Sequence, residues 1–245
     1  LFVVENSKVI RRLLNSACQI HSFFATPEYY EEFSELLQAK GVESDKWFVA
    51  EKKLMNEIVG FRLHEGVMAL ACVPSMPYVL DDIESLVFPL VLLVGISNAE
   101  NVGAIVRNCA AFGIPSLAVD AATCNPYIRR AVRVSLGGIF ALRVYRAERA
   151  ADTLVKLKRT CPDIQIVALE ACPHAQSICR LNFQARSIIV FGSEAHGLPE
   201  EVLSVSDALV QIQMQPNREY NAVNSLNVAS ASAIALYQYS RCVFL

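Results

Sequence analysis

The chain has 245 residues, of which 53% are hydrophobic and 19% are charged, and its formal net charge is −2. This composition supports a sizeable hydrophobic core and excludes a disordered polar chain. No apolar run approaches the ~20 residues of a membrane span, so we expect neither a membrane segment nor a signal peptide. The eight cysteines are scattered without a Cys-x-x-Cys pair, which predicts reduced thiols in a cytoplasmic protein.

The charge is distributed unevenly along the chain. Residues 1–90 contain 8 Lys or Arg and 13 Asp or Glu, whereas residues 129–159 contain 9 Lys or Arg and 2 Asp or Glu. A local basic segment is expected where a protein contacts a phosphate backbone, and the alternative is an ordinary solvated surface. Arginine is well suited to phosphate, so Arg129, Arg130 and Arg133 are candidate phosphate contacts.

The first 73 residues are predicted to form a small α/β unit. Strands are expected at residues 2–4, 20–25, 47–49 and 66–73. Helices are expected at residues 9–14, from Thr26 onward and at 52–59, the second with a cap and a first-turn proline. A proline-containing linker begins at residue 74, so we place a domain boundary near residue 80, between domains 1–80 and 81–245.

From residue 81 onward strands and helices alternate, which predicts a parallel sheet covered on both faces. The six expected strands lie near residues 89–95, 116–119, 139–144, 164–169, 187–192 and 209–213. The four expected helices lie near residues 102–112, 127–134, 150–160 and 225–240. The first junction between strand and helix lacks Gly-x-Gly-x-x-Gly, which excludes a Rossmann dinucleotide site.

The last expected helix has little side-chain bulk, because every second residue from Ala229 to Ala235 is alanine and the residues between them are Ser230, Ser232 and Ile234. Small residues let another backbone approach closely, so we expect this helix to pack tightly against other parts of the chain. The alternative is an ordinary alanine-rich core helix. Asn224 or Ser225 is expected to cap its first turn.

Three short motifs lie in order at junctions between strands, loops and helices. They are Asn101-x-Gly103-x-x-x-Arg107, Gly192-x-Glu194-x-x-Gly197-Leu198 and Ser225-Leu226-Asn227-Val228. Together they resemble the three motifs of the SpoU (TrmH-like) RNA 2′-O-ribose methyltransferases of the SPOUT class. The resemblance implies a SPOUT-type α/β fold with a C-terminal trefoil knot, preceded by a small substrate-binding domain of ribosomal-protein-like fold. It also implies a homodimer that methylates rRNA or tRNA with S-adenosyl-L-methionine.

The same resemblance assigns catalytic roles to five residues: Arg107, Asn101, Glu194, Ser225 and Asn227. Arg107 is implied to be the base or activator of the ribose hydroxyl. Arginine is a poor base in water, so a role in orienting the phosphate is the alternative. Asn101 and Ser225 are also potential helix caps. Glu194 could accept hydrogen bonds from Asn101, from Arg107 or from the backbone, and it is equally suited to anchoring its loop.

The resemblance further implies that the cofactor is held mostly by backbone groups. These lie at Gly192, Ile212 and Leu226, with Leu169 and Met214 as apolar walls. Gln213 stands where the family usually has proline, and the loop from residue 215 to 223 is longer than usual. No metal is expected, because Cys172, His174, Cys179 and His196 have irregular spacing.

Two other functions compete with the methyltransferase. One is a non-catalytic RNA-binding or assembly protein that retains the knotted fold, and the other is a generic nucleotide-binding α/β enzyme. The intact polar residues of all three motifs favour the enzyme. Arg129, Arg130 and Arg133 then become candidate RNA contacts.

Overall fold

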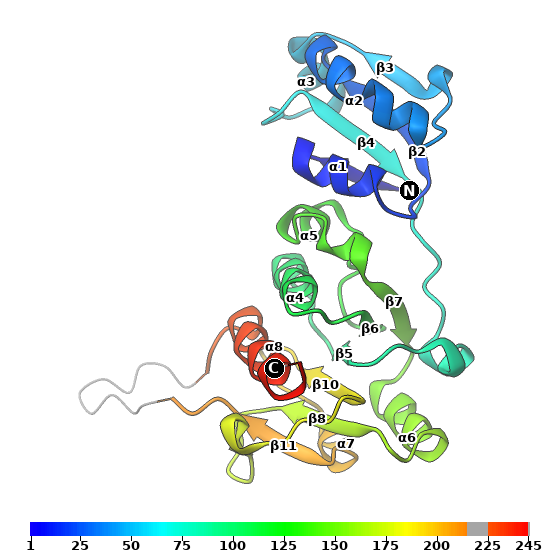
Figure 1. Cartoon of the computed structure of the whole chain (residues 1–245). Helices are drawn as coiled ribbons and strands as arrows, with labels where there is room; N and C mark the ends of the chain where they lie inside the picture. The colour runs from blue at the N-terminus through cyan, green and yellow to red at the C-terminus, as the bar shows by residue number, and fades with distance from the viewer. Residues whose placement is uncertain (215–224, 245) are drawn as a thin grey trace, which may run out of the picture.

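The computed structural model describes residues 1–214 and 225–244 and contains two β-sheets (Figure 1). The first sheet has the strand order β1-β4-β2-β3. Its strands are β1 (Phe2–Glu5), β2 (Ile20–Ala25), β3 (Trp47–Val49) and β4 (Val67–Ala71). β4 pairs antiparallel with β1 and β2, and β3 pairs parallel with β2. The helices of this unit are α1 (Ser7–Leu14), α2 (Pro27–Ala39) and α3 (Lys52–Val59).

The helices of the first unit follow local sequence signals. The Asn6 side chain accepts a hydrogen bond from the backbone N–H of Lys8 and caps α1. α1 turns one apolar face to the core, made of Val9, Ile10, Leu13 and Leu14. α2 begins at Pro27 as expected, although the Thr26 side chain makes no capping bond. The strands and helices predicted for this region are therefore confirmed, with bounds that differ by a few residues.

The second sheet has the strand order β7-β6-β5-β10-β8-β11-β9, and every neighbouring pair is parallel. Its strands are β5 (Leu90–Leu93), β6 (Ser116–Asp120), β7 (Arg143–Ala147), β8 (Gln165–Leu169), β9 (Gln176–Ser177), β10 (Ser187–Phe191) and β11 (Ala208–Gln211). Its helices are α4 (Ala99–Ala111), α5 (Arg129–Val134), α6 (Ala150–Thr160), α7 (Glu200–Ser204) and α8 (Val228–Val243). The predicted parallel sheet is confirmed.

Both faces of the second sheet are buried, as a parallel sheet requires. Side chains alternate between the faces along each strand. Val91 and Leu93 belong to the core that includes residues of α4, α5 and α8 and continues into the first unit. Leu90 and Leu92 belong to a second core with residues of α6 and α7. The strands therefore consist of continuous apolar runs.

One predicted strand was misplaced. Residues 138–141 form a 3₁₀ turn instead of the start of a strand, and β7 begins only at Arg143. The apolar run there resembles a buried strand in sequence. However, Gly137 has a φ of 76°, which glycine adopts freely. The chain therefore turns there, and residues 138–141 pack against α4. The short elements β9 and α7 were not predicted.

The starts of two helices also differ from prediction. α8 begins at Val228 and is capped by Asn227, so the expected cap at Ser225 was wrong, and Asn224 lies outside the described residues. α4 is capped by Asn98, which places Asn101 inside the first turn rather than at the cap. In both cases an asparagine side-chain oxygen accepts from free first-turn N–H groups.

α4 packs closely against α5 and α8. A Cβ atom at Gly103 would lie 2.6 Å from the carbonyl oxygen of Ala131, so only glycine allows this approach of α4 to α5. The Asn108 amide donates to the Ala229 carbonyl and to Ser232 Oγ of α8, each at 2.9 Å. The small residues of α8 therefore face a neighbouring helix, which confirms the predicted tight packing.

The first unit contacts the second through β1 and α1, while the chain after β4 runs along one side of the molecule (Figure 1). The Phe2 ring lies 5.4 Å from that of Tyr127 and 6.1 Å from that of Phe140. Arg12 Nη1 donates to the Leu136 carbonyl at 2.6 Å. In the part of the chain that the structure describes, no helix is both long and apolar enough to span a membrane.

Candidate active site

One polar residue from each of the three motifs takes part in a single hydrogen-bonded network: Asn101, Glu194 and Asn227. Glu194 follows β10, and each of its carboxylate oxygens accepts one amide N–H. Asn101 Nδ2 of α4 donates to Oε2 at 2.6 Å, and Asn227 Nδ2 donates to Oε1 at 2.5 Å. Asn227 Nδ2 also lies 3.0 Å from Asn101 Oδ1. One exposed carboxylate thus joins elements far apart in the sequence.

Asn227 links this network to the backbone of α8. Its Oδ1 accepts from the backbone N–H of Ala229 at 2.9 Å and of Ser230 at 3.3 Å. The same side chain therefore caps the helix and donates to Glu194. Because both ends of the amide are used, the Asn227 side chain is held in one orientation.

A cavity of about 380 Å³ adjoins the network, within the usual size range of small-molecule sites. It lies at the carboxyl ends of β8, β10 and β11 and at the start of α8, where open α/β sheets bind ligands. All five predicted cofactor residues line it: Leu169, Gly192, Ile212, Met214 and Leu226. Glu194, Ser225 and Asn227 line the same cavity.

Two glycines of the second motif allow the loop after β10 to fold over the cavity. A Cβ atom at Gly192 would lie 2.5 Å from the backbone carbon of Gly197 and 2.7 Å from the nitrogen of Leu198. Gly197 has a φ of 64°, a conformation that other residues adopt rarely. A side chain at Gly192 would push the loop away from the end of β10, and one at Gly197 would strain the backbone and collide with the Glu170 carboxylate.

Glu170 is a cavity residue that the sequence prediction missed. It directly follows β8, and its Oε2 accepts from the backbone N–H of Leu198 at 2.8 Å. Its carboxylate also packs against Gly197, where a Cβ atom would lie 2.6 Å from Oε2. A carboxylate at the end of a buried strand was the available sequence signal. Glu170 therefore fastens the second-motif loop to β8.

Arg107 lies on α4 beyond this network. Arg107 is exposed and does not line the cavity. It forms no ion pair with any residue among 1–214 and 225–244. The neighbouring Asn108 instead turns toward α8. Arg107 is therefore a solvent-exposed residue on the helix that carries Asn101.

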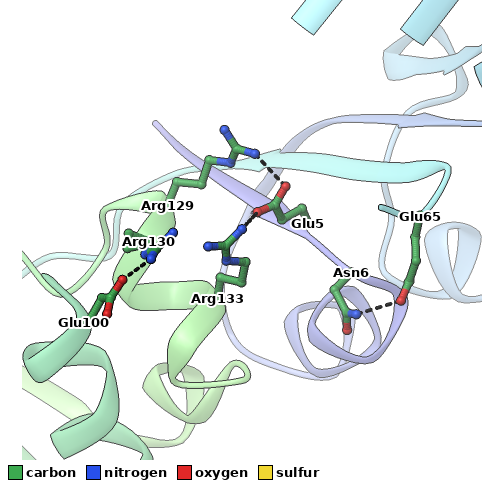
Figure 2. A network of polar contacts seen from close by, with 7 residues as sticks. All are labelled: Glu5, Asn6, Glu65, Glu100, Arg129, Arg130 and Arg133. Atoms are coloured by element: carbon green, nitrogen blue, oxygen red, sulfur yellow. Dashed lines mark hydrogen bonds and ion pairs between the residues drawn. The ribbon is translucent and has the colours of Figure 1, made fainter. Parts of the chain in front are cut away.

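The three predicted phosphate contacts on α5 are paired within the chain (Figure 2). Arg129 Nη2 lies 2.7 Å from Glu5 Oε2, and Arg133 Nη1 lies 3.4 Å from Glu5 Oε1. Arg130 pairs with Glu100, which directly precedes Asn101 in α4. Within the described ranges, no group of three or more potential metal ligands was found.

The fold and the cavity define an α/β protein with a small-molecule site at the ends of its parallel strands. Residues 89–237 match the sequence model of the SpoU rRNA methylase family, and the chain belongs to this family. An uncharacterised tRNA/rRNA methyltransferase of Mycobacterium tuberculosis is 29% identical over 98% of this chain and 81% of its own length. A 23S rRNA (adenosine(1067)-2′-O)-methyltransferase of Streptomyces laurentii is 35% identical over 65% of this chain and 57% of its own length.

Solved structures share the fold along nearly the whole chain. The SpoU methyltransferase AviRb of Streptomyces viridochromogenes, in complex with AdoMet, has a TM-score of 0.79 and 22% identity, covering 98% of this chain and 89% of its own. An AdoMet-bound rRNA methyltransferase of Sinorhizobium meliloti has a TM-score of 0.80 and 21% identity, covering 98% of this chain and 87% of its own. The α/β fold with a parallel sheet is therefore that of SpoU methyltransferases.

Proposed function

We propose that this protein methylates the 2′-hydroxyl of a ribose in rRNA or tRNA. RNA methylation with S-adenosyl-L-methionine as donor is the activity of its family, and the protein is an enzyme of this kind. The observation that carries the 2′-O assignment is the convergence of all three motifs beside one cavity.

The residues of the cavity fit S-adenosylmethionine. The cavity combines apolar walls with backbone groups at strand ends, a lining suited to an adenine ring and its polar edge. Glu170 and Glu194 add two carboxylates, and Lys and Arg are missing from the lining residues in the described part of the chain. A negative lining favours a ligand that carries a sulfonium charge. We therefore assign the cofactor to Leu169, Gly192, Ile212, Met214 and Leu226.

The bound cofactor would supply an electrophilic methyl group, while side chains of this protein orient the acceptor. We propose that Arg107 holds the substrate phosphate and lowers the pKa of the ribose hydroxyl through its positive charge. A guanidinium remains protonated at neutral pH, which disfavours a role as general base. Glu194, Asn101 and Asn227 hold the loops that frame the site, and Ser225 lies exposed at its edge, where it can contact the acceptor.

We further propose that residues 1–80 form the substrate-binding domain and residues 81–245 the methyltransferase domain. Support comes from the two separate sheets and from the linker that joins them. A C-terminal trefoil knot and a homodimer are part of the same proposal. Exposed apolar side chains of α8, Ile234 and Tyr237, are available for a dimer contact. Eight free cysteines support a cytoplasmic location.

Two measurements test the proposed function. Calorimetry should show S-adenosylmethionine binding without added metal, and ribose-methylation mapping of total RNA should lose one signal when the gene is deleted. Absence of cofactor binding at millimolar concentration would favour the alternative of a non-catalytic RNA-binding protein. Cofactor binding with an unchanged ribose-methylation map would refute the 2′-O assignment.

A further inference from the structure

The arginines of α5 form a row whose partners are carboxylates from two other elements (Figure 2). Glu5, at the end of β1, pairs with both Arg129 and Arg133, although 124 and 128 residues separate them in sequence. Glu100, in the first turn of α4, pairs with Arg130. The row therefore extends from the first unit to the turn that contains Asn101 of the active-site network.

The two sides of these ion pairs differ in exposure. The Glu5 side chain is only 13% exposed, whereas those of Arg129 and Arg133 are 38% and 45% exposed. A guanidinium has five N–H donors, and one carboxylate shared by two arginines uses only some of them. The row thus remains accessible to another anion while Glu5 is in place.

The position of Glu5 is set by a strained junction. The next residue, Asn6, has φ 82° and ψ 128°, a conformation that residues other than glycine rarely adopt. Glu65 holds this junction, because its carboxylate accepts from Asn6 Nδ2 at 2.7 Å and from the Ser7 backbone N–H at 2.6 Å. Strain that the surroundings maintain is found preferentially at functional positions.

We propose that Glu5 is an internal substitute for an RNA phosphate on Arg129 and Arg133, and that substrate RNA replaces it. Glu100 has the same role for Arg130. The identity of the ligand as RNA rests on the proposed function. In the free protein the two carboxylates reduce the charge of the three arginines from +3 to +1.

The exchange depends on the solvent-exposed side of the two ion pairs. The Arg129 and Arg133 side chains are 38% and 45% exposed, so solvent weakens their attraction to Glu5, although Glu5 itself is only 13% exposed. A phosphate can accept two parallel N–H bonds from one guanidinium, and its binding releases condensed counterions. RNA binding would also remove one polar link between the first unit and α5. The contacts of Phe2 with Tyr127 and of Arg12 with Leu136 would remain.

The test is the variant Glu5→Gln, which keeps the shape of the side chain but removes its charge. Phosphate contacts are independent of sequence, so poly-uridylate and unfractionated tRNA are adequate probes. We expect Glu5→Gln to bind both RNAs about two- to tenfold more tightly, because RNA no longer has to displace a charged partner from the two exposed arginines. In the Arg129→Ala/Arg133→Ala background the same change should have no effect. Asp163→Asn, which neutralises the partner of Arg186 at 2.8 Å, is the matched control and should leave RNA affinity unchanged.

Unchanged or weaker RNA binding by Glu5→Gln would overturn the proposal, and weaker binding together with a lower melting temperature would make Glu5 a structural link. Cofactor titration separates this result from the proposed function. If the wild type binds no S-adenosylmethionine, the proposed function fails whatever Glu5→Gln does. If the wild type binds cofactor and methylates RNA but Glu5→Gln gains no affinity, only the Glu5 proposal fails.

Discussion

The substitution Glu194→Gln tests whether one carboxylate holds the active-site loops together. Glu194 accepts two amide N–H groups, at 2.6 Å from Asn101 and 2.5 Å from Asn227. Glutamine has one acceptor oxygen, so its own N–H₂ group must face one of the two amides. A hydrogen bond to a charged group contributes about 1.5–3 kcal/mol, and less at an exposed residue such as Glu194. We therefore expect a loss of about 1 kcal/mol, roughly a fivefold change in an equilibrium constant.

This loss should appear in two measurements. The melting temperature should fall by about 2–4 °C, the shift expected per kcal/mol in a chain of this size. The affinity for S-adenosylmethionine should fall about fivefold in calorimetry, since the Glu194 loop lines the cavity. The exposed Glu148 provides the control, because Glu148→Gln makes the same chemical change away from the site. An unchanged melting temperature and cofactor affinity in Glu194→Gln would refute the idea that this carboxylate holds the loops.

Three further predictions concern other parts of the fold. Arg107→Ala should remove most methyl transfer in a single-turnover assay while cofactor affinity and melting temperature stay near wild type, and Arg107→Lys should restore little. Loss of cofactor binding by the Ala variant would instead make Arg107 structural. Gly103→Ala should lower the free energy of unfolding by about 1–3 kcal/mol in urea titrations, since its Cβ would lie 2.6 Å from the Ala131 oxygen; an unchanged midpoint would contradict this packing. Burial raises the pKa of Tyr239 to about 12. The folded state therefore binds the phenolic proton more tightly than the unfolded state, whose phenol titrates near pH ~10. The stability from Tyr239 should be complete below that pH and lost as pH rises through about 12, and Tyr239→Phe should abolish this part of the pH dependence.

The candidate site shows which contacts a sequence can predict. The residues of the three motifs were identified by their resemblance to the family motifs, and they lie around one network and cavity, apart from Arg107. Glu170 was missed because its partner, the Leu198 N–H, is 28 residues away and belongs to the backbone. A backbone partner has no sequence signal of its own.

The basic segment shows which contacts a sequence cannot predict. Arg129, Arg130 and Arg133 were correctly identified as a cluster of positive charge on one short helix. Their pairing with Glu5 and Glu100 could not be predicted, because Glu5 lies 124 residues before Arg129. Net charge counted along a segment omits partners that folding brings from elsewhere. The amount of positive charge that the cluster presents to solvent therefore depends on a tertiary contact.

By itself, the sequence determined most strands and helices and the family motifs, since periodicity, capping residues and glycine positions are local properties. Only the tertiary structure decided that β10 lies between β5 and β8, and that Asn227 rather than Ser225 caps α8. It also decided that Asn101, Glu194 and Asn227 share one hydrogen-bond network. These outcomes depend on which distant strands and side chains come within hydrogen-bonding distance of one another once the core is packed. Local propensity carries no information about that choice.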